Sequence, residues 1–355
     1  MRIAILWGGM SGYLNACIKE LASREGIELF VSHQAPVPEA PYNDGQFAWI
    51  KNRLMWQSKA EFAPLRERLR SFDPEIMVFC GWHVSAYRRM ARELAKRCWR
   101  VLVMDNCWKA TAKQRLGVLI SPWYVRPLAD AVWLPGERQA VFARRLGFEQ
   151  REILWGSLSC DQPAIERVHL SRLAEGRSVP RSFLFLGRFV AEKGVEKLVE
   201  AYQSYRERSK NPWPLVCCGA GPLSSRLEGR PGIRVEGFVQ PGQLQGILAS
   251  SGCLILPSTL EPWALAVHEA TSAGLLILAS ENVGATVHLV QDHYNGYIFD
   301  SHDVKALAVL MSQVSNLSDG RLDAMSRGSH LLSKQFTPTR WADTLLEGFR
   351  TAALR

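Results

Sequence analysis

Residues 253–269 read CLILPSTLEPWALAVHE and change from a strand pattern to a helix pattern. The first five residues form a short apolar run, which is typical of a strand buried on both faces of a parallel sheet. Pro262 keeps Glu261 out of helical conformation, so we expect Glu261 on the loop between strand and helix. The stretch therefore predicts one strand–loop–helix unit of an α/β protein.

The same alternation of short apolar runs and amphipathic stretches continues along nearly the whole chain. It predicts parallel sheets that are covered by helices on both faces. The strands expected in the first half are Ile3–Trp7, Ile27–Ser32, Ile76–Cys80, Val101–Met104, Ala131–Leu134 and Ile153–Trp155. Those expected in the second half are Phe183–Leu186, Leu215–Cys218, Ile233–Phe238, Cys253–Pro257, Leu275–Ala279 and Tyr297–Phe299.

Length and composition agree with this pattern. The 355 residues are enough for two domains, which a polar stretch at 170–181 would separate. We expect domain bounds of 1–168 and 169–337, with a last helix over 338–355. No apolar run approaches the roughly 20 residues that span a bilayer, and the N-terminus lacks the pattern of a secretory signal. The eight cysteines show no spacing typical of zinc or disulfide frameworks, so we expect a cytoplasmic protein.

Two further motifs follow strands of the second half. Residues 185–194 read FLGRFVAEKG, which puts Arg188 and Lys193 at a strand's carboxyl edge, where cations suit a diphosphate. The alternative is a solvated loop in which Lys193 pairs with Glu192. Residues 218–222 read CGAGP, where Gly219 and Gly221 would let a phosphate approach the backbone. The alternative is a tight turn that needs glycine in any case.

Glu261 and Glu269 are separated by seven residues, and they could hold hydroxyl groups at the two ends of an extended ligand. The alternative is a helix-dipole partner and a surface glutamate. Together, these motifs resemble the donor-binding domain of family 4 retaining glycosyltransferases, which have the GT-B fold. The matching residues are Gly187-Arg188 with Lys193, Gly219-x-Gly221-Pro222, Val235-x-Gly237-Phe238, Leu256-Pro257-Ser258, Glu261 with Glu269, Gly274 and Asn295-Gly296-Tyr297.

The chain departs from the family at two positions, because Ala264 and Ala285 stand where glycine is usual. In the first half the resemblance is looser and rests on Gly8-Gly9 after the first strand, together with the strand order. The GT-B fold implies two Rossmann-like domains that face each other across a cleft. It also implies that the last helix, 338–355, returns to the first domain.

The resemblance implies a role for each motif residue. Arg188 and Lys193 would neutralise the leaving nucleotide diphosphate, so that neither a metal nor another cofactor is expected; the sequence has no Asp-x-Asp motif. Glu261 would bind the transferred sugar and Glu269 the ribose. Backbone groups would bind the rest of the donor: those of Trp263, Ala264 and Leu265 the sugar and phosphate, those of Gly237, Phe238 and Val239 the base, and those of Gly8 and Gly9 the phosphates.

Many relatives place a histidine after the fourth strand of the first domain. Asp105 and Asn106 occupy that place here, and Asp105 is our candidate catalytic replacement. The alternative is that the two residues cap a helix. His83 follows the preceding strand and is a further candidate contact for sugar or acceptor, or a structural histidine.

The resemblance implies retaining transfer of a hexose-type sugar from a UDP- or GDP-sugar to a cell-envelope glycan or glycolipid bound by the first domain. A nucleotide-sugar 2-epimerase of the same fold and a non-catalytic binding relative remain alternatives. A Rossmann dehydrogenase fits poorly, because no acidic residue ends the second strand. Nucleic-acid binding has no motif to support it.

Residues 1–165 hold 23 Lys and Arg against 16 Asp and Glu. These basic residues, interleaved with tryptophans and leucines, suit the surface of an anionic bilayer, and we expect peripheral association with the inner face of the membrane. The alternative is a cationic face above core aromatics. The two clusters are Lys51, Arg53, Lys59, Arg66, Arg68 and Arg70, and Arg88, Arg89, Arg92, Lys96, Arg97 and Arg100.

Overall fold

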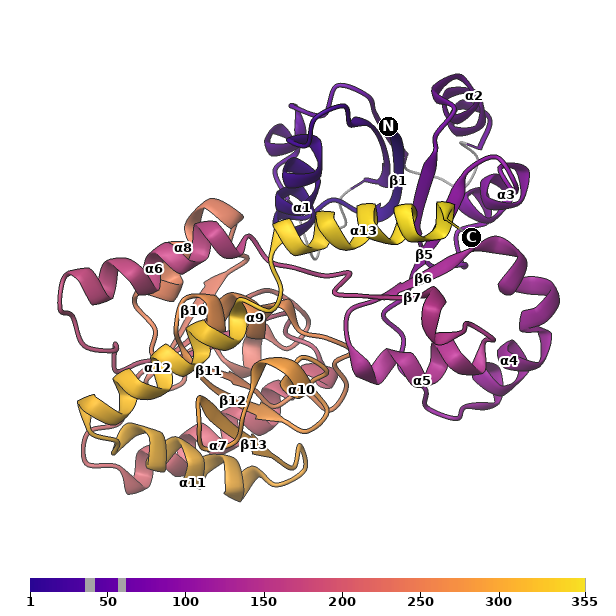
Figure 1. Ribbon diagram of the computed structural model, residues 1–355. Helices are drawn as coiled ribbons and strands as arrows, with labels where there is room; N and C mark the ends of the chain where they lie inside the picture. Colours follow the sequence, from indigo (N-terminus) through magenta and orange to yellow (C-terminus); the bar gives the residue numbers. More distant parts are fainter. Residues whose placement is uncertain (36–41, 57–61, 355) are drawn as a thin grey trace. The chain divides into compact units, whose positions relative to one another are not determined.

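The computed structural model describes residues 1–35, 42–56 and 62–354. The chain divides into two compact units (Figure 1). Unit 1 contains the described residues up to Cys160 together with helix α13 (Pro338–Ala353), and unit 2 contains Asp161–Thr337. The boundary expected after residue 168 lies inside helix α6 (Gln162–Ala174). This helix packs against α8 (Pro241–Ala249) and α9 (Leu265–Ser272) of unit 2, so the units divide before it.

Unit 1 is built on a seven-stranded parallel sheet in the order β3-β2-β1-β4-β5-β6-β7. Its strands are β1 (Arg2–Gly9), β2 (Glu28–Gln34), β3 (Arg53–Trp56), β4 (Ile76–Cys80), β5 (Trp99–Val103), β6 (Ala131–Leu134) and β7 (Ile153–Trp155). Its other helices are α1 (Gly12–Ala22), α2 (Phe62–Phe72), α3 (Ser85–Glu93), α4 (Ala112–Tyr124) and α5 (Glu137–Arg145). The sequence pattern did not predict the edge strand β3.

Alternate residues of the strands pack into two hydrophobic clusters, one on each face of this sheet. Leu6 of β1 belongs to the cluster that α2, α3 and α5 cover, whereas Ile5 belongs to the cluster that α1 and α13 cover. Helix α13 returns to unit 1, as expected. Its Trp341 lies 4.7 Å from Trp133 between ring centroids, and the indole Nε1 donates a hydrogen bond of 2.9 Å to the carbonyl of Ser157.

Unit 2 is built on a six-stranded parallel sheet in the order β10-β9-β8-β11-β12-β13. Helix α7 packs against α11, and α9 packs against α6, α10 and α12. The strands are β8 (Phe183–Leu186), β9 (Leu215–Cys218), β10 (Ile233–Gly237), β11 (Cys253–Leu256), β12 (Leu276–Ser280) and β13 (Gly296–Phe299). The remaining helices are α7 (Val195–Arg208), α10 (Thr286–Leu289), α11 (Val304–Ser315) and α12 (Asp319–Ser333).

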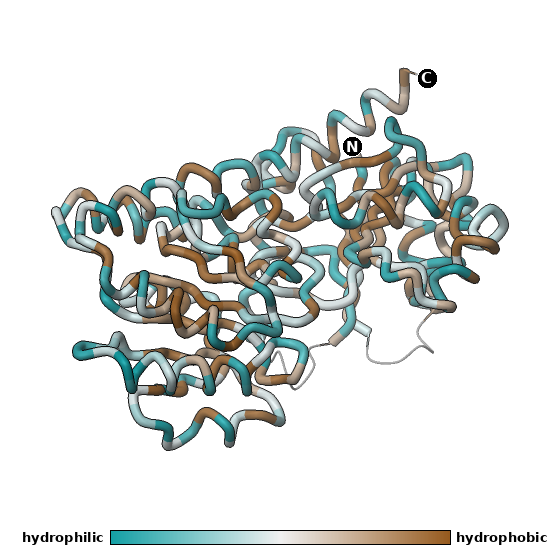
Figure 2. Tube along the Cα trace, turned by 90° about the horizontal axis from the view of Figure 1, so that it is seen from below, coloured by the Kyte–Doolittle hydropathy of each residue, from teal (hydrophilic) through white to brown (hydrophobic). Residues whose placement is uncertain are grey.

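These two sheets confirm the predicted α/β class with two doubly wound, parallel sheets. Every expected strand is present within two residues of its predicted bounds. Figure 2 shows that the strands are mostly hydrophobic, whereas the helices alternate between hydrophobic and hydrophilic residues. In each sheet the strand order reverses once, between β1 and β4 in unit 1 and between β8 and β11 in unit 2. The carboxyl ends of the strands beside such a reversal are where open α/β sheets bind ligands.

Candidate functional site

The candidate site of unit 2 consists of the three loops that follow β8, β9 and β11, at the reversal of strand order. Backbone hydrogen bonds join the loops to one another. The amide of Phe189 donates to the carbonyl of Ala220 at 2.9 Å, and the amide of Thr259 donates to the carbonyl of Glu192 at 2.8 Å. The motifs quoted from the sequence therefore form one connected edge of the sheet.

Close packing of these loops accounts for their glycines. A Cβ atom at Gly219, where φ is +148°, would lie 1.9 Å from the carbonyl oxygen of Gly187. A Cβ atom at Gly194, where φ is +70°, would lie 2.2 Å from the carbonyl oxygen of Pro257. The turns need glycine even without a ligand, which supports the plainer interpretation of these residues. The same packing fixes where the cations and carboxylates of the loops lie.

Lys193 and Glu261 form an ion pair between the loop after β8 and the loop after β11. Both side chains are largely buried, with exposed fractions of 18% for Lys193 and 11% for Glu261. Glu261 is held in extended backbone, because it bridges to Val283 and its carbonyl accepts a 2.9 Å hydrogen bond from the amide of Gly284. The alternative in which Lys193 pairs with Glu192 is wrong.

Arg188 is exposed at the same edge of the sheet. Its guanidinium forms no hydrogen bond or ion pair with another described residue. A cation in this state can bind an anionic ligand without first breaking a protein contact. The loop therefore offers one free cation and one that is already paired.

Glu269 lies in the second turn of α9 and is half-buried. Burial raises the pKa of its carboxyl to about 8. No other described residue forms a hydrogen bond or ion pair with this carboxyl. Because polar groups that lose water without gaining a partner are costly, an unpartnered and partly buried carboxyl is a candidate ligand contact.

The start of α9 has an unusual backbone. Ala264 is the residue that precedes the helix, with φ of +81° and ψ of 85°, a left-handed conformation that favours glycine. The chain thus keeps the conformation that a glycine would adopt, with alanine in its place. The amides of Ala264 and Leu265 form no hydrogen bond with another described residue, as the geometry of a helix start dictates.

The side chain of Trp263 belongs to the interior of unit 2. Its ring centroid lies 5.1 Å from that of Phe336 and 5.8 Å from that of His288. Its buried indole Nε1 has no hydrogen-bond partner among the described residues, and neither has the buried hydroxyl of Ser258. Ser258 ends the Leu-Pro-Ser motif, but nothing in the sequence alone marks its hydroxyl as a candidate contact. The third base-contact candidate, Val239, is half-buried with Gly237 and Phe238 between β10 and α8.

The candidates of unit 1 lie at the carboxyl edge of its own sheet. Gly8 and Gly9 end β1, and unit 1 itself does not require glycine there. A Cβ atom at Gly9 would meet nothing within 4 Å, and one at Gly8 would lie 3.5 Å from Sγ of Cys80. Burial raises the pKa of the Cys80 thiol to about 12, and the charge of Asp105 adds to that rise. Gly8 and Cys80 are therefore neighbours, and the charge of Asp105 acts on the same thiol.

Asp105 and Asn106 follow β5 and are exposed. They do not cap α4, which begins at Ala112 and is capped by Thr111, whose hydroxyl accepts from the amide of Gln114 at 3.2 Å. Nε2 of Gln139, in the first turn of α5, donates to the carbonyl of Asp105 at 3.2 Å, so the loop lies beside the start of that helix. His83 is exposed as well and lies close over Gly81. The unit 1 candidates thus lie together at the carboxyl edge of the unit 1 sheet, and the unit 2 candidates lie together at the carboxyl edge of the unit 2 sheet.

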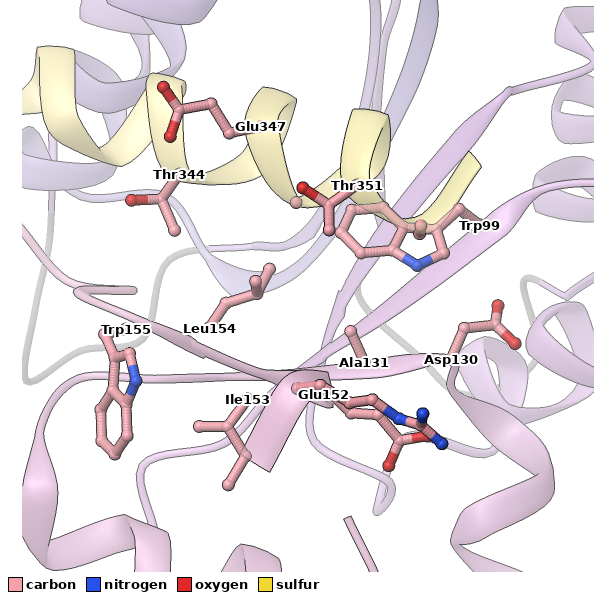
Figure 3. Close-up of a pocket in the computed structure, with 13 residues that line it drawn as sticks. Trp99, Asp130, Ala131, Glu152, Ile153, Leu154, Trp155, Thr344, Glu347 and Thr351 are labelled. Atoms are coloured by element: carbon pink, nitrogen blue, oxygen red, sulfur yellow. The ribbon is translucent and has the colours of Figure 1, made fainter. Parts of the chain in front are cut away.

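A pocket of about 320 Å³ lies elsewhere in unit 1, between α13 and β7 (Figure 3). Trp99, Asp130 and Glu152 line it at the amino ends of β5, β6 and β7, which is the opposite edge from Asp105. None of the predicted site residues lines this pocket. Among the described residues, no three or more His, Cys, Asp or Glu side chains are grouped so that they could bind a metal ion.

Comparison with known proteins finds similarity in the second half of the chain. Residues 175–329 match the family model described as Glycosyl transferases group 1. An uncharacterized glycosyltransferase of Methanocaldococcus jannaschii is 28% identical over 138 residues, which are 37% of this chain and 35% of that protein. The O-antigen chain mannosyltransferase B of Escherichia coli is 27% identical over 162 residues, 43% of this chain and 42% of that protein. The matches thus span well under half of these relatives.

Solved structures resemble the chain over nearly its whole length. HepE of Anabaena, in complex with UDP and glucose, has a TM-score of 0.73 at 14% identity and covers 99% of this chain and 100% of its own. Sucrose-phosphate synthase of Thermosynechococcus elongatus has a TM-score of 0.74 at 14% identity and covers 100% of this chain and 99% of its own. At such low identity these likenesses establish the GT-B fold only.

Proposed function

We propose that the chain is a retaining glycosyltransferase that moves a hexose-type sugar from a UDP- or GDP-sugar to a glycan or glycolipid of the cell envelope. One observation carries the proposal: Lys193 and Glu261 pair across the reversal of the unit 2 sheet, with Arg188 unpaired on the same edge. The group 1 match at 175–329 and the UDP complex of HepE support a nucleotide-sugar donor. The relation to an O-antigen mannosyltransferase supports an envelope glycan as acceptor.

In the proposed complex the donor diphosphate lies against the loop after β8. Arg188 binds it directly, and Lys193 lies between the diphosphate and Glu261. Negative charge on the diphosphate grows as the bond to the sugar breaks, so fixed cations at this edge lower the barrier. We propose that these two cations do the work for which other transferases use a metal ion, and that no other cofactor takes part.

The carboxyls and backbone amides of residues 261–269 would bind most of the rest of the donor. Glu261 accepts hydrogen bonds from hydroxyls of the sugar, and Glu269 accepts them from the ribose. The unpartnered amides of Ala264 and Leu265, with that of Trp263, donate to sugar and phosphate oxygens. The base lies against the backbone from Gly237 to Val239.

Unit 1 supplies the acceptor side in this proposal. The backbone of Gly8 and Gly9 meets the diphosphate, and Asp105, Asn106 and His83 contact the sugar or the acceptor. The acceptor hydroxyl attacks the anomeric carbon on the face from which the diphosphate leaves. Its proton passes to the departing phosphate oxygen, so the anomeric configuration is kept without an enzyme nucleophile.

Product analysis tests this function. The protein is incubated with UDP- and GDP-hexoses, with and without a mixture of envelope glycolipids, and donor and products are separated. Transfer requires the acceptor and releases nucleoside diphosphate, whereas a 2-epimerase converts the donor sugar alone. A non-catalytic relative binds the nucleotide and converts nothing. Activity should persist in EDTA, and a loss that manganese restores would contradict the role given to Arg188 and Lys193.

A further inference from the structure

Helix α4 of unit 1 carries four large apolar side chains on its surface. Leu116, Leu119, Ile120 and Trp123 have exposed fractions of 58%, 69%, 38% and 76%. Their spacing of three, four and seven residues places them on one side of the helix, and we call these four residues the α4 face. No helix among the described residues is long and apolar enough to cross a bilayer.

The opposite side of α4 attaches the helix to unit 1. The buried hydroxyl of Ser121 donates a 2.6 Å hydrogen bond to the carbonyl of Leu146. Val118 and Tyr124 pack against the hydrophobic cluster beneath the helix. The α4 face is therefore turned away from the core that normally covers such a stripe.

Positive charge surrounds the α4 face. Residues 106–129 include Lys109, Lys113, Arg115 and Arg126 and no Asp or Glu. Lys113 is exposed and lies one turn before Leu116 on the same side of the helix. Arg88 and Arg92 of α3 lie over the ring of Tyr124, at 5.4 and 5.9 Å from its centroid. Of these cations, Arg126 is paired with Glu152.

The basic cluster expected to meet a membrane is arranged differently. Arg66 and Arg70 both pair with Glu93, and Arg68 donates to the carbonyl of Arg53 at 2.9 Å and to Oδ1 of Asn52 at 2.8 Å. The leucines between them, Leu65 and Leu69, are buried. These cations thus form a face above core residues, which is the alternative considered for this cluster. Lys59 lies outside the described residues.

We propose that the α4 face inserts into the headgroup region of an anionic lipid bilayer, with Lys113 and Arg115 against the lipid phosphates. A tryptophan at the end of an apolar stripe suits that region, and basic residues beside it add attraction to anionic lipid. A second copy of the chain fits less well, because two α4 faces would bring like charges together. The surplus of positive charge thus selects lipid over self-association.

Docking through α4 would also set where the carboxyl edge of the unit 1 sheet, which carries Asp105, lies relative to the bilayer. The loop from Asp105 to the helix is tied to α4, because Nε2 of Gln114 donates to the carbonyl of Cys107 and its Oε1 accepts from the amide of Lys109, both at 2.7 Å. The edge would then lie near the headgroups, within reach of a lipid-borne acceptor. This last step rests on the proposed function, whereas the docking itself does not.

Flotation tests the docking. The wild type should float with vesicles of phosphatidylglycerol and phosphatidylcholine, not with phosphatidylcholine alone, and less as salt is added. Leu119→Ser with Trp123→Ser should weaken binding at least about tenfold, since it removes the most exposed apolar groups. Leu331→Ser with Val309→Ser is the matched control, because these side chains are 59% and 56% exposed in unit 2.

Charge variants show whether the cations beside the α4 face or the arginines of α2 contribute more to lipid binding. Lys113→Gln with Arg115→Gln should weaken binding by about fivefold per cation, and Arg66→Gln with Arg70→Gln should weaken it less. Circular dichroism and urea unfolding of each variant show whether unit 1 stays folded. Unchanged flotation of the Leu119 and Trp123 variant, equal binding to neutral vesicles, or no binding by the wild type overturns the docking. Docking without sugar transfer would count against the proposed function alone.

Discussion

Lys193 and Glu261 are 68 residues apart in the sequence and form an ion pair beside the reversal of strand order in unit 2. The pair links the residue proposed to hold the leaving diphosphate to the residue proposed to hold the sugar. A donor that draws Lys193 toward its phosphates would also free lone pairs of Glu261 for sugar hydroxyls. Binding at the two ends of the diphosphate–sugar bond would thus be coupled.

A double-mutant cycle tests that link. Lys193→Met and Glu261→Gln should each lower the free energy of unfolding by about 1 to 3 kcal/mol, because each leaves a largely buried partner without compensation. The double variant should lose less than the sum of the two, with a coupling of about 1 kcal/mol. Urea unfolding followed by tryptophan fluorescence measures all four proteins. Additive losses would show that the two side chains do not interact in solution.

Arg188→Ala should lower kcat by about 100-fold while raising the KM for the nucleotide-sugar donor much less, because its charge acts most strongly on the departing diphosphate. Arg208→Ala is the matched control, since Arg208 is an exposed arginine at the end of α7 in the same unit. Steady-state kinetics on the identified donor gives kcat and KM for both variants. Equal rates for the Arg188 variant and the wild type would remove Arg188 from the site.

Glu269 should make stability depend on pH. Its pKa of about 8 lies above the usual value of 4.5, so between these pH values the unfolded chain loses a proton that the folded chain keeps. The free energy of unfolding therefore falls as pH rises from about 5 to 8, by up to about 1.4 kcal/mol per pH unit. Glu269→Gln should flatten this slope in urea titrations from pH 5 to 8. If the slope of stability against pH is unchanged in Glu269→Gln, other ionisable groups cause it.

Nucleotide binding should show the opposite trend. Ribose hydroxyls donate hydrogen bonds to a carboxylate, so the ligand favours the ionised form of Glu269. Affinity measured by calorimetry should then rise between pH 7 and pH 9 in the wild type and stay level in Glu269→Gln. A variant that kept the wild-type rise would place the ribose elsewhere.

The two alanines that replace family glycines should respond differently to restoring glycine. Ala264 has φ of +81°, so Ala264→Gly removes a strain of about 1 to 2 kcal/mol, partly offset by the greater freedom of the unfolded chain. Ala285 has φ of −67° and is buried, so Ala285→Gly should cost about 1 kcal/mol. Thermal unfolding should show a higher Tm for the first variant and a lower Tm for the second.

The sequence pattern predicted the strands well because buried parallel strands are short apolar runs between helices. It missed β3, whose residues Arg53–Trp56 form a half-exposed edge strand. The pattern also predicted that the three loops of unit 2 lie close together, since the carboxyl ends of parallel strands meet at one sheet edge. The Lys193–Glu261 pair could not be predicted, because the choice between Glu192 and Glu261 depends on how two loops pack. The α4 pattern predicts an apolar side but not what covers it.

Asp105 provides the last test, because it stands where relatives have a histidine and it does not cap α4, the helix that follows it. Asp105→Asn keeps the size of the side chain and removes its charge. If Asp105 contacts only the sugar or the acceptor, sugar transfer should fall by about 100-fold, the lower end of general acid–base contributions.

The affinity for free UDP or GDP should stay near that of the wild type, since the nucleotide contacts are proposed on unit 2. Asn106→Ala serves as the neighbouring control, and it should lower transfer less because it removes no charge. Kinetics on the identified donor and calorimetry with the free nucleotide provide the two readouts. A loss of nucleotide affinity as large as the loss of rate would mean that Asp105 shapes the nucleotide site or the fold of its loop, and that the missing histidine has no replacement at this position.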